Sequence, residues 1–285
     1  MTKDNLVKSV LGPSARIESP LLGGMMNDSS IILCDGKRYV LYVSTEQANE
    51  MVNRPLEKEH LQIVYKLGIT SKNVYFDTEK GIKINEFIEG SSIDKIKDYD
   101  LKKVAKLFHI LHNSPVLSPE DYSPFKRFMG YEEEALSFNK NPNEDYLLIR
   151  DELLKNKDYL ERQTKVLCHN DAQKSNIVKG EDGNYYLIDF EFMGNNDPIY
   201  DIATFGNGSV KEGFDLLNVY FDHPTQDQIK RYYLWRMYVS LQWYDVAIVK
   251  HYRGEGEAHH FNFLDVASYF LNNAKEAYQG YIKNK

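Results

Sequence analysis

The sequence is poor in cysteine, and it has no long hydrophobic run. Its 285 residues include only two cysteines, Cys34 and Cys168, and no Cys-x-x-Cys pair. Zinc ribbons and thioredoxin-type redox motifs are therefore excluded, and two reduced thiols are the simplest expectation. Apolar runs end within four to six residues, as in Ile31–Cys34, so we expect no membrane-spanning segment. The first 20 residues also lack the apolar stretch of a secretion signal, and we expect a cytoplasmic protein.

An excess of positive charge is missing as well. The chain has 35 Lys and Arg residues against 42 Asp and Glu residues, which gives a net charge of −7. A protein that coats nucleic acid or an anionic membrane is usually strongly basic, so we expect neither as a partner. This charge balance still permits a local basic pocket for a phosphate group.

The first third of the chain carries apolar runs typical of β-strands. Two of these runs, residues 30–34 and 38–43, flank Asp35-Gly36-Lys37, and Asp-Gly between such runs is a strong hairpin signal. A further strand is expected before Gly23-Gly24, so the first three strands should be antiparallel. Two more strands are expected around the turn at residues 79–81.

Helical periodicity dominates the later part of the chain. Apolar residues in 101–112 recur with the 3.6-residue period of a helix that has one buried face. The other expected helices cover residues 1–10, a segment after Pro55, 131–161, 226–250 and 264–282. A β-rich segment, residues 166–192, interrupts the helical part. The order predicts an α+β fold, with a small β-rich lobe over residues 1–88, a larger helical lobe over residues 89–285, and a hinge near 88–90.

The strongest functional signal is a pair of short motifs rich in oxygen donors. One runs from His169 through Asp171 to Asn176 in the pattern His-x-Asp-x-x-x-x-Asn, and the other, Asp189-Phe190-Glu191, begins 13 residues later. Asp171 can accept a proton from a hydroxyl group, whereas Asn176 and Asp189 offer the hard oxygen atoms that Mg²⁺ prefers beside phosphates. Each motif alone is common for structural reasons, but together, after a β-rich lobe, they favour a phosphotransferase site.

With these motifs, the sequence resembles the choline/ethanolamine kinase branch of the aminoglycoside-phosphotransferase-like kinases, which are relatives of protein kinases. The similarity is greatest to bacterial choline kinases. The matching pieces are LLGGMMNDSS, NRPLE, GIKINEFIEG, residues 169–176, LIDFEF and NNDPIYDIA. The resemblance implies a bilobal protein-kinase-like fold, with ATP and Mg²⁺ as cofactors. It also implies transfer of the ATP γ-phosphate to the hydroxyl of choline, which yields phosphocholine.

The resemblance assigns roles to single residues. It implies that Asp171 is the catalytic base, with His169 beside it at the catalytic centre. It also implies that Asn176 and Asp189 hold Mg²⁺ and that Glu191 reaches a second Mg²⁺. The implied ATP contacts, from a loop over the phosphates to a hinge beside the adenine, are Gly23, Gly24, Asn27, Ser29, Arg38, Glu57, Glu86 and Ile88.

The sequence departs from the family pattern at one strand position. Family members carry Lys or Arg on the third strand, where it pairs with a helix Glu and touches the ATP phosphates. That position aligns here with Tyr42, although the helix glutamate, Glu57, is in place. Arg38, on the same strand face, offers a long side chain that could reach inward; otherwise ATP is held more weakly or the nucleotide differs. Because the metal ligands and the base are intact, we expect an active enzyme rather than a pseudokinase.

The acceptor pocket is expected to suit a quaternary ammonium, which cannot donate hydrogen bonds and is held by aromatic faces and a carboxylate. Candidate residues are Asp197, Tyr200, Asp201, Trp235, Tyr238 and Trp243. Core packing would explain most of these aromatic residues equally well, and of the family's Trp-x-x-Trp pair only Trp243 aligns. Two alternatives therefore stay open. One is a kinase of ethanolamine, an amino sugar or aminoglycoside, or a thiamine-like cation; the other is a non-catalytic nucleotide-binding regulator.

Overall fold

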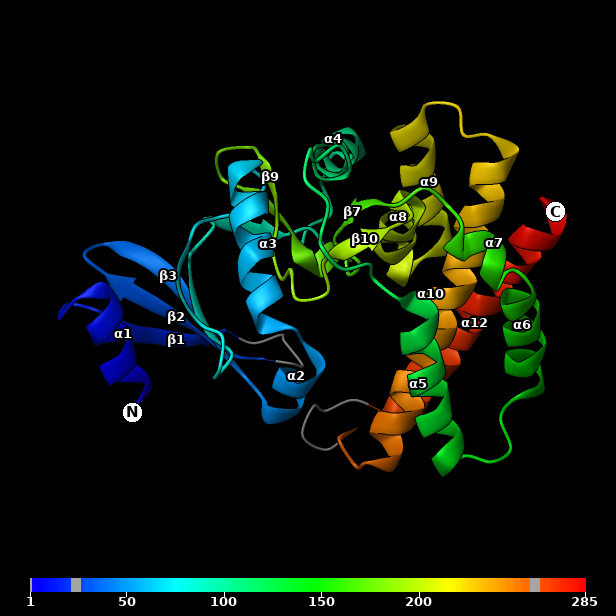
Figure 1. The fold of residues 1–285 in the computed structure, drawn as a ribbon, viewed down its shortest axis with the longest axis horizontal. Helices are drawn as coiled ribbons and strands as arrows, with labels where there is room; N and C mark the ends of the chain where they lie inside the picture. Colours follow the sequence, from blue (N-terminus) through cyan, green and yellow to red (C-terminus); the bar gives the residue numbers. More distant parts are fainter. Residues whose placement is uncertain (1, 22–26, 257–261) are drawn as a thin grey trace. The chain divides into compact units, whose positions relative to one another are not determined.

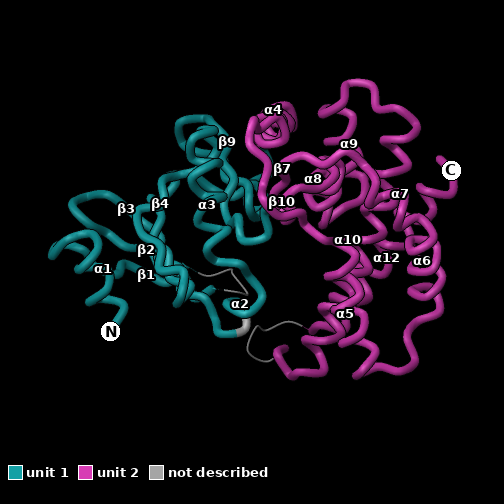
Figure 2. Tube along the Cα trace, viewed as in Figure 1, with its two compact units in different colours: residues 1–99, 174–193 teal, residues 100–173, 194–285 magenta. Residues whose placement is uncertain are grey.

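The chain forms two compact units, and each is built from segments that are distant in sequence. The structure is a computed structural model, and it describes residues 2–21, 27–256 and 262–285. The first unit combines residues 1–99 with 174–193, and the second combines 100–173 with 194–285 (Figure 2). These units differ from the expected lobes, 1–88 and 89–285, because residues 89–99 and 174–193 pack with the N-terminal residues. The predicted α+β fold class is confirmed.

The first unit is organised around a five-stranded antiparallel sheet with the order β1-β2-β3-β5-β4. Its strands are β1 (Arg16–Leu21), β2 (Asn27–Cys34), β3 (Lys37–Ser44), β4 (Asn73–Asp77) and β5 (Ile82–Glu86). The β2–β3 turn has φ values of 49° at Asp35 and 77° at Gly36. Two-residue hairpins need such positive φ values, so the Asp-Gly signal correctly predicts this turn.

Three helices complete the N-terminal part of the first unit (Figure 1). Helix α1 (Lys3–Leu11) places Val7 in an apolar core with Ile32, Leu41 and Ile84 of the sheet. Helices α2 (Glu46–Met51) and α3 (Arg54–Lys66) follow β3. The side chain of Asn53 accepts a hydrogen bond from the Leu56 amide at 3.2 Å and so caps α3. Pro55 is tolerated in the first turn, because an amide there would have no partner within the helix.

A second, three-stranded sheet in the first unit has the order β6-β8-β9. Its strands are β6 (Gly90–Ser92), β8 (Ile177–Gly180) and β9 (Tyr185–Leu187), and the short 3₁₀ helix η1 (Lys174–Asn176) precedes β8. The β8–β9 turn contains Gly183 at a φ of 79°, a conformation that glycine adopts without strain. The turn brings the segments that end in Asn176 and begin in Asp189 alongside each other, because the amide of Ile188 donates to the carbonyl of Asn176 at 3.0 Å.

The second unit is mainly helical. Its helices are α4 (Leu101–His112), α5 (Pro124–Phe138), α6 (Glu144–Lys155), α7 (Lys157–Glu161), α8 (Pro198–Phe205), η2 (Gly206–Gly208), α9 (Val210–Phe221), α10 (Gln226–Tyr252) and α12 (Phe263–Lys283). Helix α10 packs along α12 and also contacts α5, α8 and α6 (Figure 1). Strands β7 (Val166–Cys168) and β10 (Gly194–Asn196) form an antiparallel pair beside α8. Among the described residues, no helix is both long and apolar enough to cross a membrane.

The helical stretch expected over residues 131–161 is divided into α5, α6 and α7, and α5 begins earlier, at Pro124. Asn139 ends α5 with an extended backbone, and Asn143 starts α6 by accepting a hydrogen bond from the Asp145 amide at 2.9 Å. Asparagine competes for backbone hydrogen bonds and therefore favours helix ends over helix interiors. The single continuous helix was the wrong interpretation of this polar segment.

Helix α3 carries a buried histidine that should make stability depend on pH. His60 is 1% exposed, and burial lowers its pKa to about 4, with partial opposition from Glu57. The unfolded chain therefore binds a proton more readily than the folded chain below pH 6.5, and stability is lost as the pH falls from 6.5 to about 4. The loss should reach about 3 kcal/mol. Urea unfolding at pH 7 and pH 4 measures it, and His60→Gln should show a smaller difference than the wild type; equal differences would contradict this account.

Candidate active site

A buried group of charged side chains joins helix α3 to strand β5 in the first unit. The ammonium group of Lys83 forms an ion pair with one carboxylate oxygen of Glu57, and Arg54 donates to the other at 2.6 Å. All three side chains are at most 3% exposed. Burial raises the pKa of Glu57, but Lys83 and Arg54 outweigh it and leave the pKa below its ordinary value. The glutamate is therefore held charged between two cations.

Lys83 supplies the cation that the third strand lacks. In the β3–β5 ladder, Lys83 lies directly opposite Tyr42, and its ammonium group is 4.9 Å from the centre of the Tyr42 ring. Burial lowers the pKa of Lys83, but the carboxylates of Glu57, Asp189 and Glu191 raise it above its ordinary value, so it stays protonated. The conclusion from sequence that Glu57 lacks its partner was wrong, because the partner comes from β5.

Arg38, the candidate substitute, has other partners. Its guanidinium group bonds to Glu89, with the Nε–Oε1 distance at 2.9 Å, and lies 4.6 Å from the centre of the Phe87 ring. The Arg38 side chain is 40% exposed, and it does not join the Glu57 group. The expectation that it reaches inward was therefore wrong.

Asp189 follows β9 and adopts an uncommon backbone conformation, with a φ of 67°. Its Oδ1 atom is buried and has no hydrogen-bond partner within the described ranges; Lys83 Nζ lies 3.7 Å away, beyond hydrogen-bond reach. Asn176, on the adjoining segment, is 8% exposed. An unsatisfied carboxylate oxygen is costly unless a cation or donor binds it, so the donor set here fits a hard divalent cation.

Glu191 lies within the same buried group. Its carboxylate is 3.3 Å from Arg54 and its side chain is 3% exposed. Burial and the neighbouring carboxylate of Asp189 raise the pKa of Glu191 to about 7, against the opposing effect of Lys83. Arg54 also donates to Ser44 at 2.6 Å, which fixes the guanidinium group between β3 and the carboxylates. The group contains three carboxylates and two cationic side chains, so the binding of a further cation would balance its charge.

The loop after β7 carries Asp171 in the second unit. Asp171 is half-buried, and Gln173 donates to its Oδ2 atom at 3.2 Å. His169 is fully buried, and its Nδ1 atom accepts the Asp171 amide at 3.2 Å. The expectation that His169 is catalytic is corrected, because a fully buried ring can shape this loop but cannot meet a substrate.

Asp201 anchors this loop by accepting hydrogen bonds from two of its backbone amides. Its Oδ1 atom accepts the amide of Asn170 at 2.7 Å, and its Oδ2 atom accepts the amide of His169 at 2.8 Å. Asp201 lies on α8 and is 0% exposed. Its assignment to the acceptor pocket was therefore wrong, because both oxygen atoms accept backbone amides of the loop that carries Asp171.

Asp197 is likewise engaged inside the protein. It caps α8 by accepting the Ile199 amide at 3.0 Å, and it also accepts bonds from Arg231 at 3.0 Å and Trp235 at 2.9 Å. It is 1% exposed. A carboxylate with these three donors and no exposure does not offer a face to a cationic substrate, so this assignment is corrected too.

The predicted aromatic cage is largely core. Tyr200, Trp235 and Tyr238 are at most 2% exposed and pack edge-to-face on one another. Trp243 is half-buried and stacks on Phe270 of α12, with ring centres 5.7 Å apart. Tyr200, Trp235 and Tyr238 are therefore core residues, and their assignment as acceptor contacts is corrected. The position of Trp243 is explained by its packing against Phe270.

Sequence reasoning missed the more exposed aromatic residues beside this core. Tyr122 and Tyr131 are half-buried, and the Tyr122 hydroxyl lies 3.5 Å from that of Tyr200. The guanidinium carbon of Arg127 is 5.6 Å from the centre of the Tyr122 ring. The Tyr122 ring therefore has a cationic neighbour from its own chain in Arg127. The signal in the sequence was a cluster of Tyr and Arg residues around the start of α5.

The remaining ATP candidates lie in the first unit. Gly23 and Gly24 fall outside the described residues. Asn27 and Ser29 lie on β2, and Asn27 accepts a bond from the Ser44 hydroxyl at 3.0 Å. Glu86 ends β5 and Ile88 lies between β5 and β6. Their expected nucleotide contacts stay predictions.

The comparisons with known proteins agree with these motifs. The sequence profile described as choline/ethanolamine kinase matches residues 19–212. Protein LicA of Haemophilus influenzae is 28% identical over 268 residues, which cover 86% of this chain and 75% of LicA. The crystal structure of choline kinase LicA from Streptococcus pneumoniae superposes with a TM-score of 0.74 at 24% identity, covering 98% of this chain and 97% of that one. A structure of LicA in complex with AMP gives a TM-score of 0.73 at 24% identity, with 99% and 97% covered.

Proposed function

Because the chain belongs to the choline/ethanolamine kinase family, we propose that it transfers the γ-phosphoryl group of ATP to the hydroxyl group of choline. Membership identifies it as an ATP-dependent small-molecule phosphotransferase; choline, Mg²⁺ and the residue roles are the proposal. The observation that carries the proposal is the Lys83–Glu57 pair. It provides the cation that a pseudokinase would lack, and it removes the main reason for considering a non-catalytic regulator.

Lys83 is proposed to bind the α- and β-phosphates of ATP. The three surrounding carboxylates keep it protonated, and Glu57 fixes the position of its ammonium group. Oriented positive charge stabilises phosphates without reorganisation at the moment of reaction. The AMP complex of LicA, a protein of the same fold, supports a nucleotide ligand.

Asn176 and Asp189 are proposed to hold Mg²⁺. The unsatisfied Oδ1 atom of Asp189 and the excess of carboxylates over cations around it support this role. When bound, Mg²⁺ supplies the charge that neutralises the phosphate oxygens. The positive φ of Asp189 presents its carboxylate at a fixed angle, which the protein maintains at a cost of about 1–2 kcal/mol.

Asp171 is proposed to accept the proton of the substrate hydroxyl. The hydroxyl oxygen forms the new bond to the γ-phosphorus while the bond from that phosphorus to the ADP oxygen breaks, and the hydroxyl proton passes to Asp171. The hydrogen bond from Gln173 to its Oδ2 atom helps to fix the orientation of the Asp171 carboxylate. In such reactions, positioning and electrostatic stabilisation provide most of the rate, and the base adds about 10²–10⁴-fold.

Tyr122 offers the aromatic face that we expect to contact the choline ammonium group. Its replacement by Leu should raise the KM for choline about five- to thirty-fold, the effect of losing a cation–π contact worth ~1–2 kcal/mol. The KM for ethanolamine should rise less, because its ammonium group can hydrogen-bond to other acceptors. Trp243→Leu is the matched control, since its stacking on Phe270 predicts equal changes for both alcohols. A larger choline-specific loss in Trp243→Leu than in Tyr122→Leu would contradict this assignment.

A panel of acceptors tests the proposed function. ADP formation is measured with choline, ethanolamine, an amino sugar and a thiamine-like cation, each with ATP and Mg²⁺. Choline should give the highest kcat/KM. Turnover of the amino sugar alone would move the chain to the antibiotic-phosphotransferase side of its superfamily, and nucleotide binding without turnover of any acceptor would support the regulator.

A further inference from the structure

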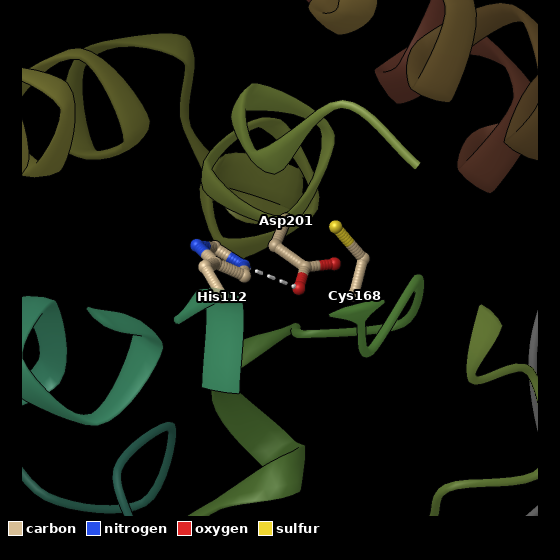
Figure 3. A group of neighbouring side chains, drawn as sticks. All are labelled: His112, Cys168 and Asp201. Atoms are coloured by element: carbon tan, nitrogen blue, oxygen red, sulfur yellow. Dashed lines mark hydrogen bonds and ion pairs between the residues drawn. The ribbon is translucent and has the colours of Figure 1, made fainter. Parts of the chain in front are cut away.

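Helix α4 ends in a buried histidine that contacts Asp201. His112 is 6% exposed and comes from α4, whereas Asp201 comes from α8 (Figure 3). The Nε2 atom of His112 lies 3.0 Å from Asp201 Oδ2, and its Nδ1 atom lies 2.9 Å from the hydroxyl of Tyr220 on α9. The imidazole therefore bridges two helices by hydrogen bonds from both of its nitrogen atoms.

The same carboxylate supports the backbone of the loop that carries Asp171. Asp201 Oδ2 accepts both the His112 ring and the His169 amide, and Oδ1 accepts the Asn170 amide. Asn170 has a φ of 63°, which costs a residue other than glycine about 1–2 kcal/mol. This conformation needs external hydrogen bonds to persist, and Asp201 supplies them. The position of Asp171, which follows Asn170 in this loop, therefore depends on the position of the Asp201 carboxylate.

A metal site is the competing interpretation of this cluster. His112, Cys168 and Asp201 place one potential ligand atom each within 4.8 Å of one another. However, the Cys168 thiol donates to the Asn196 carbonyl at 3.4 Å, and burial, followed by Asp201 and Asp197, raises its pKa well above the ordinary value. A metal binds the thiolate rather than the thiol. Since every potential ligand atom also has a hydrogen-bond partner, the cluster serves as a hydrogen-bonded support.

We infer that His112 is a positioning residue for phosphoryl transfer, acting through Asp201 to hold the loop that carries Asp171. The inference rests on the proposed role of Asp171 as the base. His112 itself is buried and makes its contacts with Asp201, Tyr220 and neighbouring core side chains. Without the imidazole, Asp201 Oδ2 still accepts the hydrogen bond from the His169 amide, but it loses the hydrogen bond from His112 on α4. The carboxylate can then rotate, and the loop backbone moves with it.

The expected kinetic result is a fall in kcat with little change in KM. His112→Leu should lower kcat about 10–100-fold, the size of effect that a displacement of about 1 Å produces at a reacting group. The KM values for ATP and acceptor should stay within about threefold of wild type, because His112 touches neither. His112→Gln, which retains a side-chain N–H donor, should recover most of the loss. A general packing defect would not be rescued in this way.

His109 provides the matched control. It lies one turn earlier on α4, stacks on the Tyr220 ring and bonds to the Tyr220 carbonyl at 3.0 Å, but it does not contact Asp201. His109→Leu therefore weakens the contact between α4 and α9 without removing a donor from Asp201, and its kcat should stay within about threefold of wild type. An equal fall in kcat for His109→Leu and His112→Leu would overturn the proposal.

Amide hydrogen exchange separates this inference from the proposed function. The amides of His169 and Asn170 should exchange at least tenfold faster in His112→Leu than in wild type, with a smaller change in His112→Gln. Amide exchange does not depend on turnover, so it tests whether His112 supports the loop even if no acceptor is phosphorylated. If His112→Leu does not fold, the comparison of His112→Gln with His112→Asn, whose shorter side chain does not reach Asp201, replaces it. Unchanged exchange and unchanged kcat in the folded variants would overturn the proposal.

Discussion

Asp171→Asn should lower kcat about 10²–10⁴-fold while the KM for ATP changes less than threefold. The substitution keeps the shape of the side chain and the contact with Gln173, but an amide cannot take the proton of the attacking hydroxyl. The nucleotide contacts proposed here involve residues of the other unit, so binding of ATP should be retained. Steady-state kinetics with choline and ATP, together with fluorescence titration of a nucleotide analogue, measure the two effects.

Asp215→Asn is the control for this substitution. Asp215 lies on α9, in the same unit, and its exposed carboxylate pairs with Lys211. Exposed pairs of this kind contribute about 0–1 kcal/mol, so kcat and stability should be close to wild type. Near-normal turnover by Asp171→Asn would show that another group accepts the proton.

Lys83→Met should weaken ATP binding by at least about tenfold and also destabilise the fold. The variant leaves Glu57 buried with Arg54 as its remaining cation, and breaking a buried ion pair costs about 3–5 kcal/mol. Because Arg54 still compensates part of the charge, the lower end of that range is expected. ATP affinity follows from titration calorimetry, and stability follows from urea unfolding.

Two further variants test whether Lys83, rather than another cation of the first unit, binds ATP. Arg38→Met removes a half-exposed cation that pairs with Glu89, so ATP affinity should not change. In the exchange variant Tyr42→Lys with Lys83→Tyr, the cation and the ring swap places across the β3–β5 ladder. Part of the ATP affinity should return, because the two positions lie directly opposite each other. Loss of ATP binding in Arg38→Met but not in Lys83→Met would reverse the assignment.

The sequence reveals the fold because its local signals are strong and agree with one another. The Asp35-Gly36 hairpin, the capped helix after Asn53 and the periodic helix over 101–112 each follow from residues close in the chain. The break between α5 and α6 was missed because its signals, Asn139 and Asn143, are individually weak. They become clear only as helix caps.

Lys83 was missed because strand register is a long-range property. Tyr42 and Lys83 are 41 positions apart, and nothing local states that they face each other across a ladder. A signal did exist: Lys83 stands between Ile82 and Ile84, so it occupies the opposite face of a buried strand, where a lysine requires a partner. Glu57 on the nearby helix was that partner.

Asp197 and Asp201 were misassigned because acidic residues near the proposed metal ligands resemble substrate contacts. Their actual roles, as a helix cap and as a support for loop amides, depend on burial and on donors from other elements. The aromatic residues of α10 misled for a related reason. Buried side chains occur on all sides of α10, as is typical of a helix enclosed by other helices. They include Tyr232, Leu234, Trp235, Met237, Tyr238 and Val239.

Phosphorus NMR of the reaction mixture tests the central claim most directly. With ATP, Mg²⁺ and choline, wild-type protein should produce a phosphate monoester resonance that grows in a one-to-one ratio with ADP. The resonance should be absent with Asp171→Asn and after removal of Mg²⁺ by a chelator. Formation of inorganic phosphate without the monoester, or no consumption of ATP by folded wild-type protein, would contradict the account.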